Sequence, residues 1–274
     1  MTRRTVFFVS DQTGVTAETL GHSLLTQFDG YEFDLVTLPF LDTLDKIQGA
    51  VEQIEQRAEE QGVAPIIFST LVQDELRQAF HPQQGRLIDF FDSYLPVLER
   101  ELHAKSSHKA GQAHGLVDAS RYDQRMDATN YALNNDDGAR TNDYARADII
   151  LTGVSRSGKT PTCLYLALSY GVFAANYPLS EDELESGQLP LILQEYKDKL
   201  YGLTIAANRL QQIRRERRAT GSYATMPQIS FEIRAAEAMF RRYKIPYVDA
   251  TRSSIEELAS TILVNTGIER RVRP

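Results

Sequence analysis

Residues 147–170 read ADIILTGVSRSGKTPTCLYLALSY, and this stretch decides the fold of the second half of the chain. It starts with an apolar run at 147–152, which predicts a buried strand. A glycine-rich loop follows. Beyond the loop, the apolar residues from Pro161 to about Tyr170 predict a helix that ends at Gly171. The order of strand, glycine loop and helix is typical of a nucleotide-binding α/β unit.

The loop matches the phosphate-binding pattern G-x-x-x-x-G-K-[ST], and its residues are Gly153, Val154, Ser155, Arg156, Ser157, Gly158, Lys159 and Thr160. Glycines let successive backbone N–H groups turn toward phosphate oxygens, and the N-terminus of the next helix adds positive potential. We expect Lys159 to reach the terminal phosphates as a catalytic cation, and the Thr160 hydroxyl to ligate Mg²⁺. The loop therefore predicts a bound nucleotide polyphosphate.

The N-terminal half of the chain alternates strand and helix patterns. Apolar and β-branched runs at 5–10, 35–40 and 65–71 predict strands, and periodic segments at 17–27 and 44–61 predict the helices between them. Strands that alternate with helices indicate a parallel sheet. The expected fold class is α/β, with an N-terminal βαβ-type parallel-sheet domain followed by a P-loop kinase-like α/β domain.

Domain boundaries follow from a change in composition after the first half. The apolar periodicity at 87–102 predicts a helix, and residues 104–115 then carry almost no apolar side chain. We expect an N-terminal α/β domain at 1–103, a helical and linker segment at 104–145, and the nucleotide-binding domain at 146–274.

Composition narrows the class of protein. The chain has 274 residues, of which 42% are hydrophobic and 24% charged, so a globular core is expected. The net charge of −7 argues against nucleic-acid and membrane-surface partners. No window approaches the roughly 18 apolar residues of a membrane span, and the single cysteine, Cys163, allows no disulfide within the chain. These features predict a cytoplasmic protein.

A basic segment at 208–218 is predicted to be helical and holds Arg209, Arg214, Arg215, Arg217 and Arg218. Arginine forks fit phosphate oxygens and the charge that develops during phosphoryl transfer. Beside a phosphate loop, this pattern favours a lid in which Arg214 and Arg218 contact the nucleotide. The alternatives are a solvated helix face and an RNA-binding patch.

Several side chains are candidates for acid–base or metal chemistry. Asp11 and Asp249 follow predicted strands, where open α/β sheets place their ligands. Asp11 could equally serve only the turn, and Asp249 could hold a metal or water or cap the last helix. His114 could be a base for a hydroxyl nucleophile, although a lone loop histidine is more often inert. Asp136 and Asp137 could hold Mg²⁺, but their sequence favours a simple turn.

The chain also resembles a known family over nearly its whole length. The matching stretches are 7–18 (FFVSDQTGVTAE), 37–40 (TLPF), 114–116 (HGL), 136–138 (DDG), 153–161 (GVSRSGKTP), 174–178 (AANYP) and 200–204 (LYGLT). Together they resemble the bacterial phosphoenolpyruvate synthase regulatory proteins, which are related to the plant pyruvate, phosphate dikinase regulatory protein. One position departs from that family's pattern, because Asn135 stands where relatives often carry histidine or tyrosine.

The resemblance implies a bifunctional enzyme whose partner is phosphoenolpyruvate synthase. Such proteins phosphorylate a threonine of the synthase with ADP as donor, which inactivates it. They also remove that phosphate with inorganic phosphate as co-substrate, which releases pyrophosphate. The loop at 10–16 is then a candidate second anion site, and a homodimer is compatible with the sequence. A P-loop small-molecule kinase and a non-catalytic nucleotide sensor are the alternatives.

Overall fold

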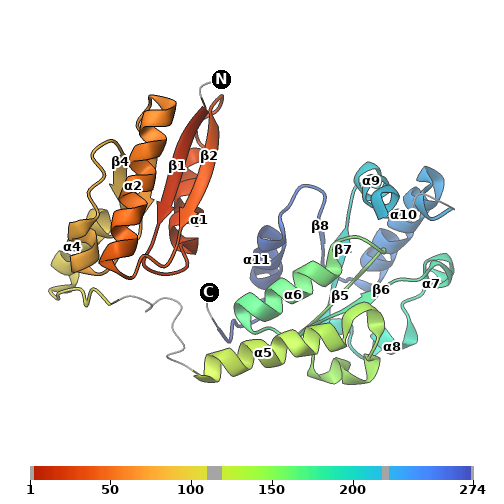
Figure 1. Cartoon of the computed structure of the whole chain (residues 1–274). Coiled ribbons are helices and arrows are strands. Elements are labelled where there is room, and N and C mark those ends of the chain that lie inside the picture. The colour runs from red at the N-terminus through yellow and green to blue at the C-terminus, as the bar shows by residue number, and fades with distance from the viewer. Residues whose placement is uncertain (1–2, 110–118, 218–221, 273–274) are drawn as a thin grey trace. The chain divides into compact units, whose positions relative to one another are not determined.

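The structure, a computed structural model, describes residues 3–109, 119–217 and 222–272 of the chain. The chain folds into two compact units, Met1–Val117 and Asp118–Pro274 (Figure 1). In its described part, each unit contains one parallel sheet of four strands. The predicted α/β class, with a parallel sheet in each half of the chain, is confirmed. Within the described ranges, no helix is both long enough and apolar enough to cross a membrane.

The first unit alternates strands and helices, and its strand order is β2-β1-β3-β4. Its elements are β1 (Arg3–Val9), α1 (Val15–Leu25), β2 (Glu32–Leu38), α2 (Leu44–Gln61), β3 (Ile66–Ser69), α3 (Asp74–Ala79), β4 (Arg86–Asp89) and α4 (Phe90–Leu102). The central strand β1 is buried on both faces because helices cover the sheet on either side. Phe8 packs in one cluster with Phe90 of α4, and Phe7 packs in another with Ile54 of α2.

The predicted helix at 87–102 is wrong at its start. Residues 86–89 form the edge strand β4, in which Leu87 pairs with Ile67 of β3. The helix α4 begins at Phe90, because the Asp89 carboxylate caps it by accepting a hydrogen bond from the Asp92 backbone N–H at 2.8 Å. The four-residue strand runs directly into the helix with no glycine, proline or asparagine between them, so the apolar residues of the two elements look like one periodic helix in the sequence.

The second unit repeats this strand order, with its sheet arranged β6-β5-β7-β8. Its helices and strands are α5 (Ala119–Asn134), β5 (Ile149–Gly153), α6 (Lys159–Tyr170), β6 (Ala174–Pro178), α7 (Glu181–Ser186), α8 (Leu191–Gln194), β7 (Leu200–Thr204), α9 (Ala207–Arg217), α10 (Met226–Tyr243), β8 (Tyr247–Asp249) and α11 (Ile255–Thr266). Short 3₁₀ turns are η1 (Asp136–Gly138), η2 (Thr141–Arg146), η3 (Lys197–Lys199) and η4 (Ser222–Ala224).

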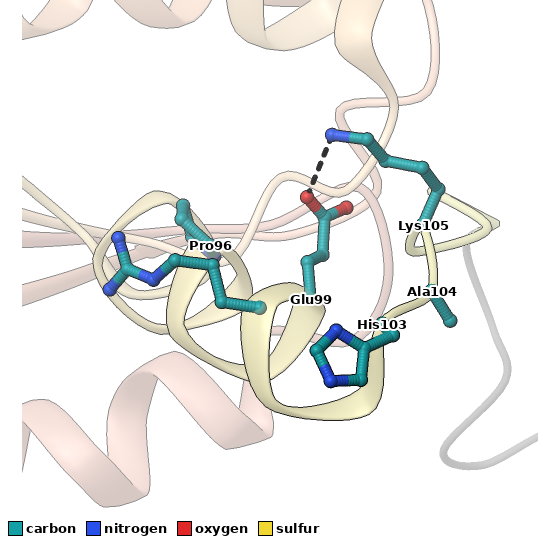
Figure 2. A pocket seen from close by; sticks show the side chains of 6 residues that line it. Pro96, Glu99, His103, Ala104 and Lys105 are labelled. Atoms are coloured by element: carbon teal, nitrogen blue, oxygen red, sulfur yellow. Dashed lines mark hydrogen bonds and ion pairs between the residues drawn. The ribbon is translucent and has the colours of Figure 1, made fainter.

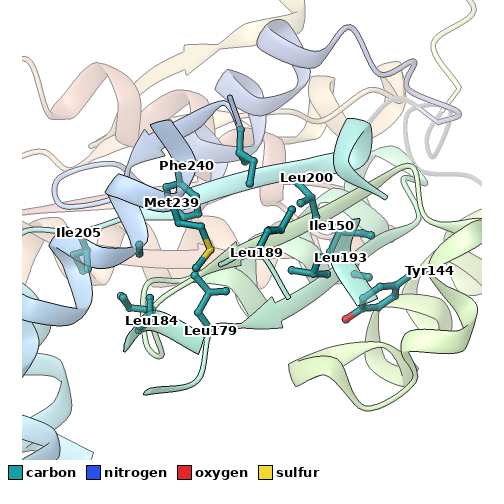
Figure 3. Packing of buried hydrophobic residues seen from close by; sticks show 14 of the residues in the cluster. Tyr144, Ile150, Leu179, Leu184, Leu189, Leu193, Leu200, Ile205, Met239 and Phe240 are labelled. Atoms are coloured by element: carbon teal, nitrogen blue, oxygen red, sulfur yellow. The ribbon is translucent and has the colours of Figure 1, made fainter. Parts of the chain in front are cut away.

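Two apolar clusters hold the second sheet between its helices. On one face, Ile150 of β5 and Leu200 of β7 pack with Met239 and Phe240 of α10 (Figure 3). On the other face, Leu151 of β5 packs in the cluster that includes residues of α5, α6 and α11. Because both faces are covered, β5 is buried along its whole length, and its carboxyl end presents the glycine loop at the sheet edge.

The division between the units differs from the boundaries expected at 103 and 145. The helix α5 packs along α6, with Ala128 and Ala132 buried in the same cluster as Leu166. These small side chains let the two helices approach closely, so α5 folds with the second unit. The sequence signal for a separate segment at 104–145 came from the low apolar content of residues 104–115.

Candidate functional site

The glycine loop lies at the switch point of the second sheet. The chain passes from β5 outward to β6 and then crosses back to β7 on the other side of β5, so the strand order reverses between β5 and β7. In open parallel sheets, ligands bind outside the carboxyl ends of the strands at this point. The loop connects β5 directly to the N-terminus of α6, as the phosphate-binding pattern requires.

Two glycines of the loop have backbone conformations that other residues rarely adopt. Gly153 has a φ of 146°, and a Cβ atom there would lie 2.3 Å from the Leu203 carbonyl oxygen of β7. Gly158 has a φ of 96° at the N-cap of α6. The first glycine therefore allows close packing of the loop on β7, and the second turns the chain into the helix.

Lys159 is buried under the loop. Its Nζ donates to the carbonyl oxygens of Val154 at 2.9 Å and Gly153 at 3.2 Å. Burial lowers the pKa of the Lys159 amine from 10.5 to about 8, although the nearby carboxylates, chiefly that of Asp137, oppose the change. The loop's own carbonyl oxygens therefore hold the amine in place.

The lowered pKa of Lys159 predicts that nucleotide binding is coupled to proton uptake. A polyphosphate in the loop would favour the charged amine, so above about pH 8 binding of a nucleotide such as ADP would require uptake of a proton, and its affinity should fall by about tenfold per pH unit. Calorimetry in buffers of different ionisation enthalpy measures this uptake, which Lys159→Met should lack. ADP binding that is independent of pH from 7 to 10 would contradict it.

The same pKa has a defined effect on stability. The pKa of Lys159 in the folded chain lies below the ordinary value of 10.5. The unfolded chain therefore binds the extra proton between about pH 8 and 10.5, and the cost of burying the charge is present below pH 8 and is relieved as the pH rises.

A carboxylate network joins η1 to the start of α6. The Thr160 hydroxyl donates to Oδ1 of Asp136 at 2.8 Å, and the Asn176 side-chain amide donates to the same oxygen. The Asn176 amide oxygen in turn accepts from the Asp137 backbone N–H at 3.2 Å. Asp137 has a positive φ of 49°, and its side chain is exposed. The predicted turn at 136–138 therefore also brings two carboxylates to the phosphate loop.

Arg214 occupies a different environment from the one expected for a solvent-facing lid. Its guanidinium is fully buried and forms an ion pair with Glu232 of α10 at 2.6 Å. It also donates to the backbone carbonyl oxygens of Tyr223 at 2.9 Å and Ser155 at 3.1 Å, and it stacks on the Tyr223 ring at 4.1 Å. The Ser155 and Tyr223 hydroxyls lie 3.0 Å apart. Arg214 therefore anchors the phosphate loop through the Ser155 carbonyl oxygen.

Asp249 lies at the carboxyl end of the edge strand β8, which is separated from β5 by β7. Its exposed carboxylate accepts hydrogen bonds from the backbone and the hydroxyl of Thr251. Ser254, and not Asp249, caps α11 through a reciprocal capping box with Glu257. The structure therefore gives Asp249 a turn-forming contact and does not bring it to Lys159.

Asp11 lies in the first unit, at the carboxyl end of β1. It is buried, and Oδ2 accepts a hydrogen bond from the Val72 backbone N–H at 3.0 Å. The loop ends at Gly14, which has a φ of 83° at the N-cap of α1. Thr13 and Thr16 are exposed beside that helix terminus. His114 and Arg218, the remaining candidates, lie outside the described residues.

A shallow hollow in the first unit surrounds the end of α4 (Figure 2). Glu99 lines this hollow and forms an ion pair with Lys105, with 3.2 Å between Oε2 and Nζ. Hydrogen bonds from Ser106, together with Lys105, lower the pKa of Glu99 to about 2. A carboxylate with so low a pKa is a poor proton acceptor at neutral pH, so Glu99 is not suited to act as a general base.

Sequence reasoning missed Tyr223, Glu232 and Asn176, and favoured a simple turn for Asp136. Asn176 and Asp136 lie in two of the stretches that carry the family resemblance, and this was the available signal. No comparable signal marked Glu232, because its contact with Arg214 spans eighteen residues and depends on how α9 and α10 pack.

The chain matches the model of the kinase/pyrophosphorylase family over residues 6–263. The chain belongs to this family. Kinase/pyrophosphorylase relatives are similar along their full lengths. A protein of Alkalilimnicola ehrlichii is 54% identical over 270 residues, which are 98% of each chain. A protein of Stutzerimonas stutzeri is 51% identical over 271 residues, or 99% of this chain and all of the relative. Both carry the name "Putative phosphoenolpyruvate synthase regulatory protein".

Membership of the kinase/pyrophosphorylase family indicates a phosphotransferase. The glycine loop, the buried Lys159 and the two carboxylates of η1 form a cluster in the second unit that could perform such a transfer.

Proposed function

We propose that this kinase/pyrophosphorylase regulates phosphoenolpyruvate synthase by phosphorylating one of its threonines with ADP and by removing that phosphate with inorganic phosphate. The names of the relatives support the partner. The observation that supports the chemistry best is the exposed Asp137 carboxylate beside the buried Lys159 amine of the phosphate loop. This pair would supply a proton acceptor and a cation at one phosphoryl group.

In the forward direction, ADP would place its β-phosphate in the loop 153–160. Backbone N–H groups and the N-terminus of α6 would bind the phosphate oxygens, and Lys159 would exchange its backbone carbonyl partners for them. The threonine oxygen forms a bond to the β-phosphorus as the bond between that phosphorus and the bridging oxygen breaks, which releases AMP. The threonine proton passes to Asp137, whose exposed side chain can meet an incoming hydroxyl.

In the reverse direction, an oxygen of inorganic phosphate attacks the phosphorus of phosphothreonine. The bond from phosphorus to the threonine oxygen breaks and pyrophosphate forms, while Asp137 accepts the proton of the attacking hydrogen phosphate and passes it to the threonine oxygen. The loop that held the ADP diphosphate would then hold the pyrophosphate product. The loop at 10–16 is our candidate for the initial capture of inorganic phosphate, since it places Gly14 and the exposed Thr13 at the N-terminus of α1.

The site also fits Mg²⁺, which we propose as a cofactor. The Thr160 hydroxyl and the Asp136 carboxylate are hard oxygen donors that lie 2.8 Å apart. The described residues contain no group of three or more metal-binding side chains, so phosphate oxygens of the nucleotide would have to complete the ligand set. Bound there, Mg²⁺ would neutralise charge on the phosphates, while Asn176 fixes the position of Asp136.

The decisive experiment incubates the protein with phosphoenolpyruvate synthase and ADP, and maps the synthase by mass spectrometry. We expect one phosphothreonine that requires ADP, and its loss with release of pyrophosphate when phosphate replaces ADP. The proposal would be overturned if neither phosphothreonine on the synthase nor pyrophosphate were detected. Transfer from ATP to a metabolite would favour a small-molecule kinase, and regulation of the synthase by binding alone would favour a nucleotide sensor.

A further inference from the structure

Arg156, in the middle of the phosphate loop 153–160, has an unusual backbone conformation. Its φ is 73°, in the left-handed region that is unfavourable for a residue with a Cβ atom. The other positive φ angles of the loop belong to Gly153 and Gly158. Glycine would adopt this backbone at lower cost, so the conformation itself does not call for arginine.

The neighbours of Arg156 hold it in this conformation. The Ser155 carbonyl accepts from the buried Arg214 guanidinium at 3.1 Å, and the Ser155 hydroxyl contacts that of Tyr223. The Ser157 backbone N–H donates to the Val154 carbonyl at 3.3 Å, and Ser157 is buried. Because the residues on both sides are anchored, the loop keeps Arg156 in a strained conformation with its side chain exposed to solvent.

The loop therefore carries two cations in different environments. Lys159 is buried and bonded to the inner carbonyl oxygens of Gly153 and Val154. Arg156 is exposed, so its guanidinium is accessible to a group that approaches from solvent. A phosphoryl group that passed between a nucleotide in the loop and a threonine of another protein would have Lys159 on its buried side and Arg156 on its solvent side.

We propose that Arg156 is a catalytic residue that binds the transferred phosphoryl group from its acceptor side. This assignment rests on the proposed transfer between ADP and a protein threonine. As the bond from phosphorus to the bridging oxygen of ADP breaks and the bond to the threonine oxygen forms, negative charge stays on the outer phosphoryl oxygens. The planar guanidinium fork matches two such oxygens at once, which an ammonium group cannot do.

The test separates the side chain of Arg156 from its backbone. Arg156→Gly removes the guanidinium and relieves the left-handed conformation, so its melting temperature should equal or exceed that of the parent protein. Arg156→Lys keeps a charge without the fork. Arg234→Ala removes an exposed arginine from α10 and serves as the matched control.

In the reaction with phosphoenolpyruvate synthase, Arg156→Gly should lower kcat by about 10²- to 10³-fold in both directions, with Arg156→Lys in between. Its Kd for ADP should rise by about tenfold, a change of about 1.4 kcal/mol, because the guanidinium would also contact the β-phosphate of bound ADP. Arg234→Ala should change neither quantity. A kcat for Arg156→Gly within threefold of the parent would overturn the assignment, and so would a loss of ADP affinity as large as that of Lys159→Met.

A binding measurement decides the inference even if no transfer to the synthase occurs. With AMP in the loop, inorganic phosphate can occupy the place of the transferred phosphoryl group. Calorimetry on the AMP-saturated parent should show phosphate binding that requires AMP, and Arg156→Gly should weaken it by about tenfold or more. Equal AMP-dependent binding by both proteins, or none by the parent, would overturn the role of Arg156 independently of the proposed function.

Discussion

Lys159→Met is expected to reduce phosphoryl transfer by about a thousandfold without lowering the stability of the protein. The lost ammonium is the inner cation of the phosphate loop, and methionine cannot neutralise the charge that spreads over the phosphoryl oxygens. Because the amine acts on the group in transit, both the ADP-dependent and the phosphate-dependent directions should fall together.

Stability should not fall, since the charge of Lys159 is costly to bury. Methionine has a similar volume and no charge, so it removes the penalty that lowers the pKa of the amine. The two carbonyl oxygens that lose the Nζ donor keep other partners: that of Gly153 accepts from the Leu179 backbone N–H at 3.1 Å, and that of Val154 from the Ser157 N–H at 3.3 Å. No buried acceptor is left without a donor.

Initial rates in both directions and a thermal melt measure the two effects. The conservative Lys159→Arg variant tests whether charge alone is sufficient. A Lys159→Met protein that transfers phosphate at more than a tenth of the parent rate would contradict the catalytic role. A melting temperature several degrees below that of the parent would instead show that the backbone contacts of Nζ stabilise the loop.

Glu232→Ala is expected to destabilise the second unit by about 3–5 kcal/mol. The substitution removes the carboxylate that pairs with Arg214 and leaves a fully buried guanidinium without a counter-charge. Arg214 also holds the Ser155 carbonyl and stacks on Tyr223, so its displacement should loosen the phosphate loop and weaken ADP binding as well.

Denaturant unfolding of Glu232→Ala measures this effect, and Glu237→Ala is its matched control. Glu237 lies on the same helix, forms a more exposed pair with Arg241 at 3.4 Å and accepts a hydrogen bond from the Thr204 hydroxyl at 2.9 Å, so its removal should cost about 1–2 kcal/mol. A double variant, Arg214→Met with Glu232→Leu, should recover much of the lost stability, since no charge is then buried alone. A cost for Glu232→Ala no larger than that of Glu237→Ala would contradict this account.

The phosphate loop and its place in the fold could be predicted from the sequence because their causes are local. The apolar run before Gly153 specifies a buried strand, and the glycines with Lys159 and Thr160 specify the phosphate-binding turn within eight residues. The α2 helix was predicted with its observed bounds of Leu44–Gln61 from the apolar face that runs along it, and in the structure Thr43 caps its start and Gly62 ends it. Each of these signals operates over a few residues.

The edge strand β4 and the role of Arg214 could not be predicted in this way. β4 depends on pairing with β3, and its four residues carry no turn signal before α4. The arginines of α9 look alike in sequence, yet the packing of α9 on α10 buries Arg214 against Glu232 and leaves Arg209 and Arg215 exposed. Burial is set by which surfaces meet, and the local pattern does not carry that information.

The glycine loop shows where the two kinds of information separate. The order of residues from Gly153 to Thr160 is enough to specify a phosphate-binding turn between a strand and a helix, since glycine geometry and the helix terminus are properties of the local backbone. Only the tertiary structure decided that Asp136 contacts Thr160, that Lys159 is buried and that Arg156 is exposed. These features arise from contacts of η1 with the start of α6 and of α9 with the loop, because burial and charge pairing depend on residues that are distant in the chain.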